Sequence, residues 1–90
     1  MDKIDSFKIE LENNEITVQN LQGKLMLYMC SEAESIGIDI PVELNKIERE
    51  INFLDNDLEL IIYTKNTENH VSEALIVLDK AKTILKKWKR

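Results

Sequence analysis

The sequence has little of what many fold classes require, with one cysteine, one proline and two glycines among 90 residues. Because Cys30 is the only cysteine, the chain forms no internal disulfide, and a reducing, cytoplasmic setting is expected. So few glycines and prolines leave little material for the turns of a β-sandwich or barrel. The remaining composition, dominated by lysine, glutamate and aliphatic residues, indicates an all-α protein.

Long apolar runs are also missing. No stretch of about 18 apolar residues occurs, so we expect no transmembrane helix. The opening MDKIDSFK lacks the apolar segment of a signal peptide.

Basic charge is scarce before residue 71: residues 1–70 carry a net charge of −9, and residues 71–90 carry +4. Because phosphate neutralisation needs a basic face, we expect no direct nucleic-acid partner.

The clearest pattern lies in residues 41–65. Gly37 ends the preceding element, Asp39 can cap the helix, and Pro41 suits its first turn. Apolar residues then recur at alternating spacings of three and four, which is typical of one buried helix face. These are Leu44, Ile47, Ile51, Leu54, Leu58 and Ile61.

Two further helices are predicted, at about 14–36 and about 69–89. The first has Asn14 as its capping residue and Glu15 in its first turn. Together with the helix at 41–65, they have similar lengths and short links, which favours an antiparallel three-helix bundle in one domain, 1–90. In such a bundle, the acidic start of the middle helix lies beside the basic end of the last. The residues concerned are Glu43, Glu48 and Glu50 on one side, and Lys82, Lys86, Lys87 and Lys89 on the other.

Residues 7–18, FKIELENNEITV, allow two interpretations. A β-hairpin pairs the strands through Asn13 and Asn14, but it opposes two glutamates and has no third strand. We favour a helical arm at residues 1–13 that the bundle does not need. Its apolar residues Phe7, Ile9 and Leu11 are then candidates for contact with a partner.

No catalytic, cofactor or metal site is predicted, and we expect no enzymatic activity. His70 is the only histidine, whereas metal sites generally need several clustered ligands. Glu12 and Glu15 form an E-x-x-E pair, as in all-α nucleotide pyrophosphatases, but the E-x-x-D that completes such sites is absent. Cys30 has no histidine neighbour and is interpreted as a buried small side chain.

Large apolar residues remain on the middle helix after its core face is assigned. Phe53, Leu60 and Tyr63 share a second face, which Arg49 extends. A small bundle exposes such a stripe only where something covers it. Either the N-terminal arm or a partner protein covers this stripe, and the sequence favours neither alternative.

The C-terminal LKKWKR can bind an anionic lipid surface through its lysines and Trp88. We favour the alternative in which Trp88 belongs to the core and the lysines face the middle helix, and we therefore expect no membrane partner.

The segment ELNKIEREINF, residues 43–53, resembles small helical accessory proteins of Gram-positive phages and genomic islands, over about half of the chain. That resemblance implies an accessory role in a mobile element and no enzymatic activity.

From these observations we expect a non-catalytic protein–protein interaction module, a small cytoplasmic inhibitor or regulator that docks through helix faces. The partner is another protein, which an acidic surface can engage by imitating nucleic acid. The alternative is a structural module that forms a homodimer through the heptad of residues 41–65.

Overall fold

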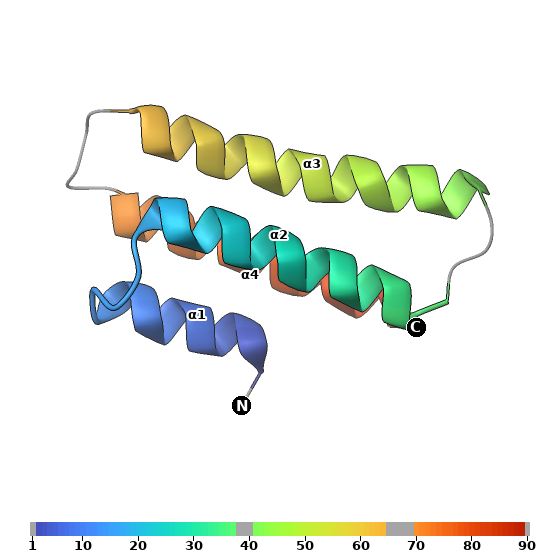
Figure 1. Ribbon diagram of the computed structural model, residues 1–90, viewed down its shortest axis with the longest axis horizontal. Coiled ribbons are helices and arrows are strands. Elements are labelled where there is room, and N and C mark those ends of the chain that lie inside the picture. Colours follow the sequence, from blue (N-terminus) through green and yellow to red (C-terminus); the bar gives the residue numbers. More distant parts are fainter. Residues whose placement is uncertain (1, 38–40, 65–69, 90) are drawn as a thin grey trace.

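The computed structural model describes residues 2–37, 41–64 and 70–89. They form four helices, α1 (Lys3–Glu12), α2 (Val18–Ser35), α3 (Pro41–Tyr63) and α4 (His70–Trp88). These residues contain no strand, and the prediction of an all-α fold is confirmed. In Figure 1, α3 runs opposite to α2 and α4, α4 lies behind α2, and α1 lies beside them. The helices α2, α3 and α4 pack against one another.

The N-terminal residues form a helix of the core, not an accessory arm. Ile4, Phe7 and Leu11 of α1 are all buried, and the helix packs chiefly against α4. The Phe7 ring also meets the Tyr28 ring of α2 edge-on, with centroids 6.2 Å apart. The β-hairpin interpretation of residues 7–18 is therefore wrong. The idea of a dispensable arm needs correction too, because an amphipathic helix must bury its apolar face, and this one does so within the chain.

The two asparagines after α1 end that helix. Asn14 adopts a left-handed conformation, with φ of 60°, which asparagine tolerates better than most residues. Its N–H donates to the Leu11 carbonyl at 3.1 Å, and the Glu15 N–H donates to the Glu10 carbonyl at 2.8 Å. This pair of bonds is a Schellman motif, which satisfies carbonyls at a helix C-terminus. Asn14 thus terminates α1, and it does not cap the next helix as predicted.

The N-terminal cap of α2 is Thr17. Its side chain accepts from the Asn20 N–H at 3.0 Å, while the Asn20 side chain accepts from the Thr17 N–H at 3.3 Å. This reciprocal capping box fixes the start at Val18, four residues after the predicted start. At the other end Gly37, with φ of 67°, follows the last turn as expected.

The two later helices lie close to their predicted ranges. α3 begins at Pro41, as expected, and ends at Tyr63, two residues before the predicted end. α4 is described from His70 to Trp88. Asp39, which was expected to cap, and residues 65–69 lie outside the described residues.

One hydrophobic core connects all four helices. From the predicted heptad of α3, Leu54, Leu58 and Ile61 belong to this core and Ile51 packs against it, whereas Leu44 is exposed. α3 packs against α2 and α4. The buried apolar residues of the core are Ile4, Phe7, Leu11, Val18, Leu21, Leu25, Met29, Leu54, Leu58, Ile61, Ala74, Val77, Leu78, Ala81, Ile84 and Leu85.

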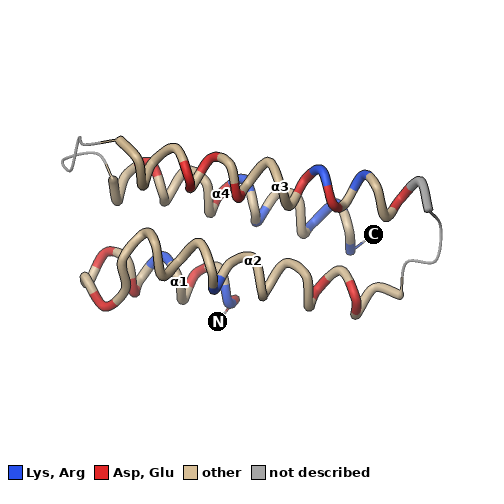
Figure 2. The backbone as a smooth tube through the Cα atoms, turned by 45° about the horizontal axis from the view of Figure 1, so that its top comes forward, with Lys and Arg blue, Asp and Glu red and all other residues tan. Residues whose placement is uncertain are grey.

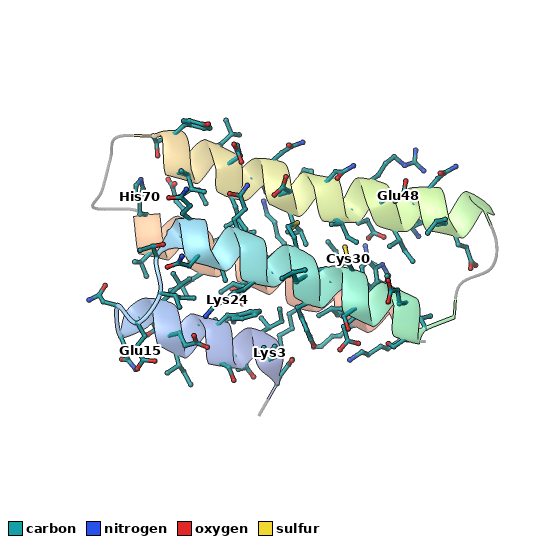
Figure 3. All side chains as sticks on the ribbon, viewed as in Figure 1. Lys3, Glu15, Lys24, Cys30, Glu48 and His70 are labelled. Atoms are coloured by element: carbon teal, nitrogen blue, oxygen red, sulfur yellow. The ribbon has the colours of Figure 1, made fainter. Side chains whose placement is uncertain are left out.

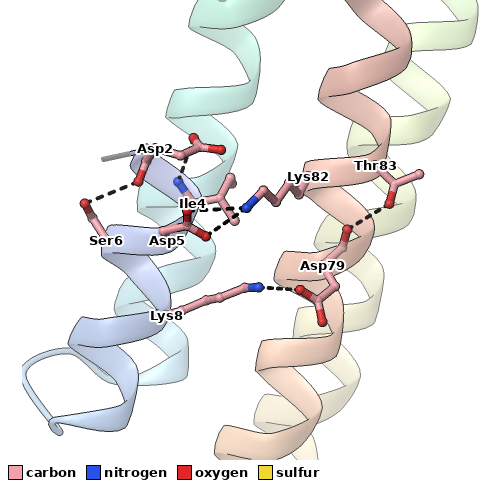
Figure 4. A network of polar contacts seen from close by, with 8 residues as sticks. All are labelled: Asp2, Ile4, Asp5, Ser6, Lys8, Asp79, Lys82 and Thr83. Atoms are coloured by element: carbon pink, nitrogen blue, oxygen red, sulfur yellow. Dashed lines mark hydrogen bonds and ion pairs between the residues drawn. The ribbon is translucent and has the colours of Figure 1, made fainter.

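Ion pairs join α1 to α4 across their shared edge (Figure 4). Lys82 donates to both carboxylate oxygens of Asp5, at 3.0 and 3.3 Å, and Lys8 pairs with Asp79. In another pair, Lys89 lies 3.6 Å from Glu32 of α2. Among the described side chains, none of these lysines pairs with the acidic start of α3. The start of α3 does lie beside the end of α4 as predicted, since Glu43, Glu50 and Lys87 line one hollow. The carboxylates that pair with Lys82 and Lys89, however, come from α1 and α2.

Candidate functional site

An open groove lies between α3 and α4 on the surface. It contains a hollow of about 470 Å³. α3 and α4 position its side chains, since helical residues three or four apart share a face. The hollow is lined by Lys46, Arg49, Glu50 and Phe53 from α3 and by Lys80, Thr83, Ile84 and Lys87 from α4. We call it the α3–α4 groove.

The groove is rich in cations although the chain as a whole is acidic. Four of its eight lining residues carry positive charge and one, Glu50, carries negative charge. Figure 2 shows the basic residues of α3 and α4 gathered toward the end of the bundle that holds the C-terminus. The Glu50 carboxylate accepts a hydrogen bond from Trp88 Nε1 at 3.1 Å. Trp88 itself packs against the core, as its position in the apolar stripe suggested.

Phe53 is the aromatic residue of the groove. Its side chain is 53% exposed, and it lies within the lining of the hollow. The Lys80 Nζ lies 5.3 Å from the ring centroid and 3.1 Å from a carboxylate oxygen of Asp57. Lys80 is therefore held between an aromatic face and a carboxylate, and it forms one wall of the hollow.

A second, smaller hollow of about 220 Å³ follows along the same two helices. Lys80 lines both hollows, and its ion-pair partner Asp57 lines the second one. Its other lining residues are Ile61, Glu73, Ile76 and Val77. Ile76 is exposed, and it adds an apolar position beyond Phe53.

The residues predicted to contact a partner divide into three groups. Arg49 and Phe53 line the groove together. Leu60 and Tyr63 are exposed on α3, and Ile9 is partly exposed on α1, but none of the three lines the groove. Phe7 and Leu11 are buried in the chain's own core and present no surface to a partner.

Sequence reasoning placed Lys87 beside the start of the middle helix, but it did not identify Lys80 or Thr83 as groove residues. Lys80, Thr83 and Lys87 recur at helical spacing, but so do residues on every face of that helix. No local signal in the sequence joins Lys80 and Thr83 to Lys46 and Arg49, more than thirty positions earlier. Only the packing of α3 on α4 brings the two sets together.

The remaining candidate groups have ordinary surroundings. The His70 ring hydrogen-bonds to the Thr64 carbonyl at 2.9 Å, which ties the start of α4 to the end of α3. Cys30 is exposed, contrary to the prediction that it is buried, because it lies off the buried stripe of α2 (Figure 3). Within the described part of the chain, no three His, Cys, Asp or Glu residues gather as a metal-ligand group.

Gln22 of α2 forms a polar bridge to α3. Its Nε2 donates to Asp55 at 2.9 Å and also to Glu59, and both carboxylates lie on one face of α3. Because an amide nitrogen carries two donors, one glutamine satisfies both groups. This cluster links two helices and lies away from the α3–α4 groove.

Comparison with protein-family models, with curated proteins and with solved structures finds no match to this chain. Within residues 2–37, 41–64 and 70–89, no helix has the length and apolar character needed to cross a membrane.

Proposed function

We propose that this protein is a non-catalytic binding module that regulates or inhibits another protein, and that the α3–α4 groove is its docking surface. The observation that carries the proposal is the half-exposed Phe53 in a hollow with four cations. Aromatic residues and arginine are the side chains most often responsible for binding energy at protein interfaces. The resemblance of residues 43–53 to phage accessory proteins agrees with a small regulator and names no partner.

The test is affinity capture from source cells with three forms of the chain. Wild type and Phe53→Ser are compared with Leu27→Ser, which removes an apolar side chain that is 75% exposed on α2. Leu27 lies beside α1, away from the groove. A protein retained by wild type and Leu27→Ser but lost with Phe53→Ser supports the proposal. If no captured protein responds selectively to Phe53→Ser, the proposal fails.

Homo-oligomerisation is the second candidate, and the exposure of Leu60 and Tyr63 favours it. The heptad seam proposed for it is already used within the chain, because Ile47, Leu54 and Leu58 are buried. A dimer would therefore form through the outward face of α3. Light scattering on wild type and Leu60→Ser measures the oligomeric state of each. A wild-type monomer at high micromolar concentration would eliminate this candidate.

A further inference from the structure

We infer that the ligand of the α3–α4 groove is an acidic amphipathic helix of the partner protein. This inference rests on the proposed function and adds the chemistry of the partner. It follows from three features of the chain: the way α1 is bound, the charge of the groove, and the apolar positions along it.

The first feature is that α1 shows how this bundle holds a short helix. α1 has ten residues and inserts Ile4, Phe7 and Leu11, spaced three and four apart, into the core. Its Asp5 pairs with Lys82 of α4 at 3.0 Å. α4 thus binds a helix by burying an apolar stripe and by pairing a lysine with a flanking carboxylate. On its α3 side it presents Lys80 and Lys87 to a groove that no described segment fills.

The second feature is charge. Lys46, Arg49 and Lys87 are exposed around the hollow and form no ion pair with the described side chains. The one acidic lining residue, Glu50, is already bound to Trp88. A ligand with aspartate or glutamate beside its apolar stripe would meet these cations, and complementary charge of this kind sets orientation and partner choice.

The third feature separates a helix from a nucleic acid. Phe53 and Ile84 provide an apolar floor in the first hollow, and Ile76 and Val77 do so in the second. Side chains on one face of a helix reach successive apolar positions of this kind. A nucleic-acid backbone following the same path would meet Asp57 and Glu73 in the second hollow, whose carboxylates repel phosphates. An acidic helix can place apolar residues there instead.

The experiment is a selection from a random peptide library displayed on phage, with the intact protein immobilised. Peptides of about 16 residues span about 24 Å as helices, at 1.5 Å per residue. We expect enriched peptides to be acidic, with apolar residues spaced three or four apart. Their affinity should fall roughly tenfold or more with Arg49→Glu or Lys87→Glu, and should fall with added salt. Leu27→Ser is the control and should bind as wild type does.

The other outcomes overturn the inference in distinguishable ways. If the enriched peptides are neutral or basic but still need Phe53 for binding, the groove remains a docking surface and the acidic-helix ligand is ruled out. If no peptide depends on Phe53 or Arg49, both the inference and the proposed function fail. A dimer that Arg49→Glu dissociates would make a second copy the ligand. If the protein binds a single-stranded oligonucleotide at physiological salt and Arg49→Glu abolishes this binding, the ligand of the groove is a nucleic acid.

Discussion

The ammonium group of Lys80 in α4 lies over the ring of Phe53 in α3, with Nζ 5.3 Å from the ring centroid. Asp57, one turn further along α3, holds the same ammonium group at 3.1 Å. A cation over an exposed ring is worth about 0.5–1 kcal/mol. Phe53 is thus kept in place at the surface with little contribution to folding.

The two phenylalanines should respond differently to truncation. Phe53→Ala should lower the free energy of unfolding by about 1 kcal/mol or less, since the side chain is half exposed. Phe7→Ala should lower it by about 3–5 kcal/mol, because Phe7 is 2% exposed and leaves a cavity in the core. Urea denaturation measures both values. Equal losses would contradict the assignment of Phe7 to the core and Phe53 to the surface.

Deletion of residues 1–12 should unfold the protein or leave it barely stable. Each of Ile4, Phe7 and Leu11 contributes about 1.5–3 kcal/mol by burial, and small domains have about 5–15 kcal/mol in total. Circular dichroism on thermal unfolding provides the measurement, with Ile9→Ala as a control that leaves α1 in place. A truncated chain as helical and stable as the whole would restore the view of α1 as an accessory arm.

Cys30 should react with a thiol reagent in the folded protein at about the rate seen in urea. The side chain is exposed on α2, so no unfolding is needed for access. The rate is measured from the chromophore that the thiol reagent releases, in native buffer and in denaturant. Reaction that waits for unfolding would show that Cys30 is covered, for example in a dimer.

Stability should decline at alkaline pH through Tyr28. Burial, assisted by the neighbouring Glu32, raises the pKa of Tyr28 to about 12 from an ordinary value near 10. The folded state therefore favours the protonated phenol, and its stabilisation is complete below pH 10 and lost as pH rises toward 12. The hydrogen bond to Asp79 also raises the pKa of Lys8, which acts in the same direction.

Phenolate absorbance during titration measures the Tyr28 effect directly. Tyr28→Phe should remove the late phenolate transition, near pH 12. If the late transition survives in that variant, it does not belong to Tyr28.

Thr17→Ala should lower the free energy of unfolding by about 1 kcal/mol, because the Asn20 N–H loses its acceptor at the start of α2. Thr17→Ser keeps a hydroxyl oxygen and should stay close to wild type. Chemical denaturation of the three chains makes the comparison. If both variants behave like wild type, the capping box contributes no stability.

Much of the helical layout could be predicted because its signals are local. The heptad of α3 and the glycine at position 37 mark an amphipathic face and a stop without reference to other residues. The boundary between α1 and α2 was misplaced because Asn14 serves either as a cap or as a left-handed residue. The hydrogen bonds of Glu15 and Thr17 decide between those roles.

The sequence by itself determined that the chain is helical, where its later helices lie, and that Arg49 and Phe53 share a face outside the core. Only the tertiary structure decided that α1 fills one side of the bundle while the α3–α4 groove stays open. Periodicity shows that a helix has an apolar face but does not show which surface covers it. The lysines of α4 become part of a site only when packing places them beside α3.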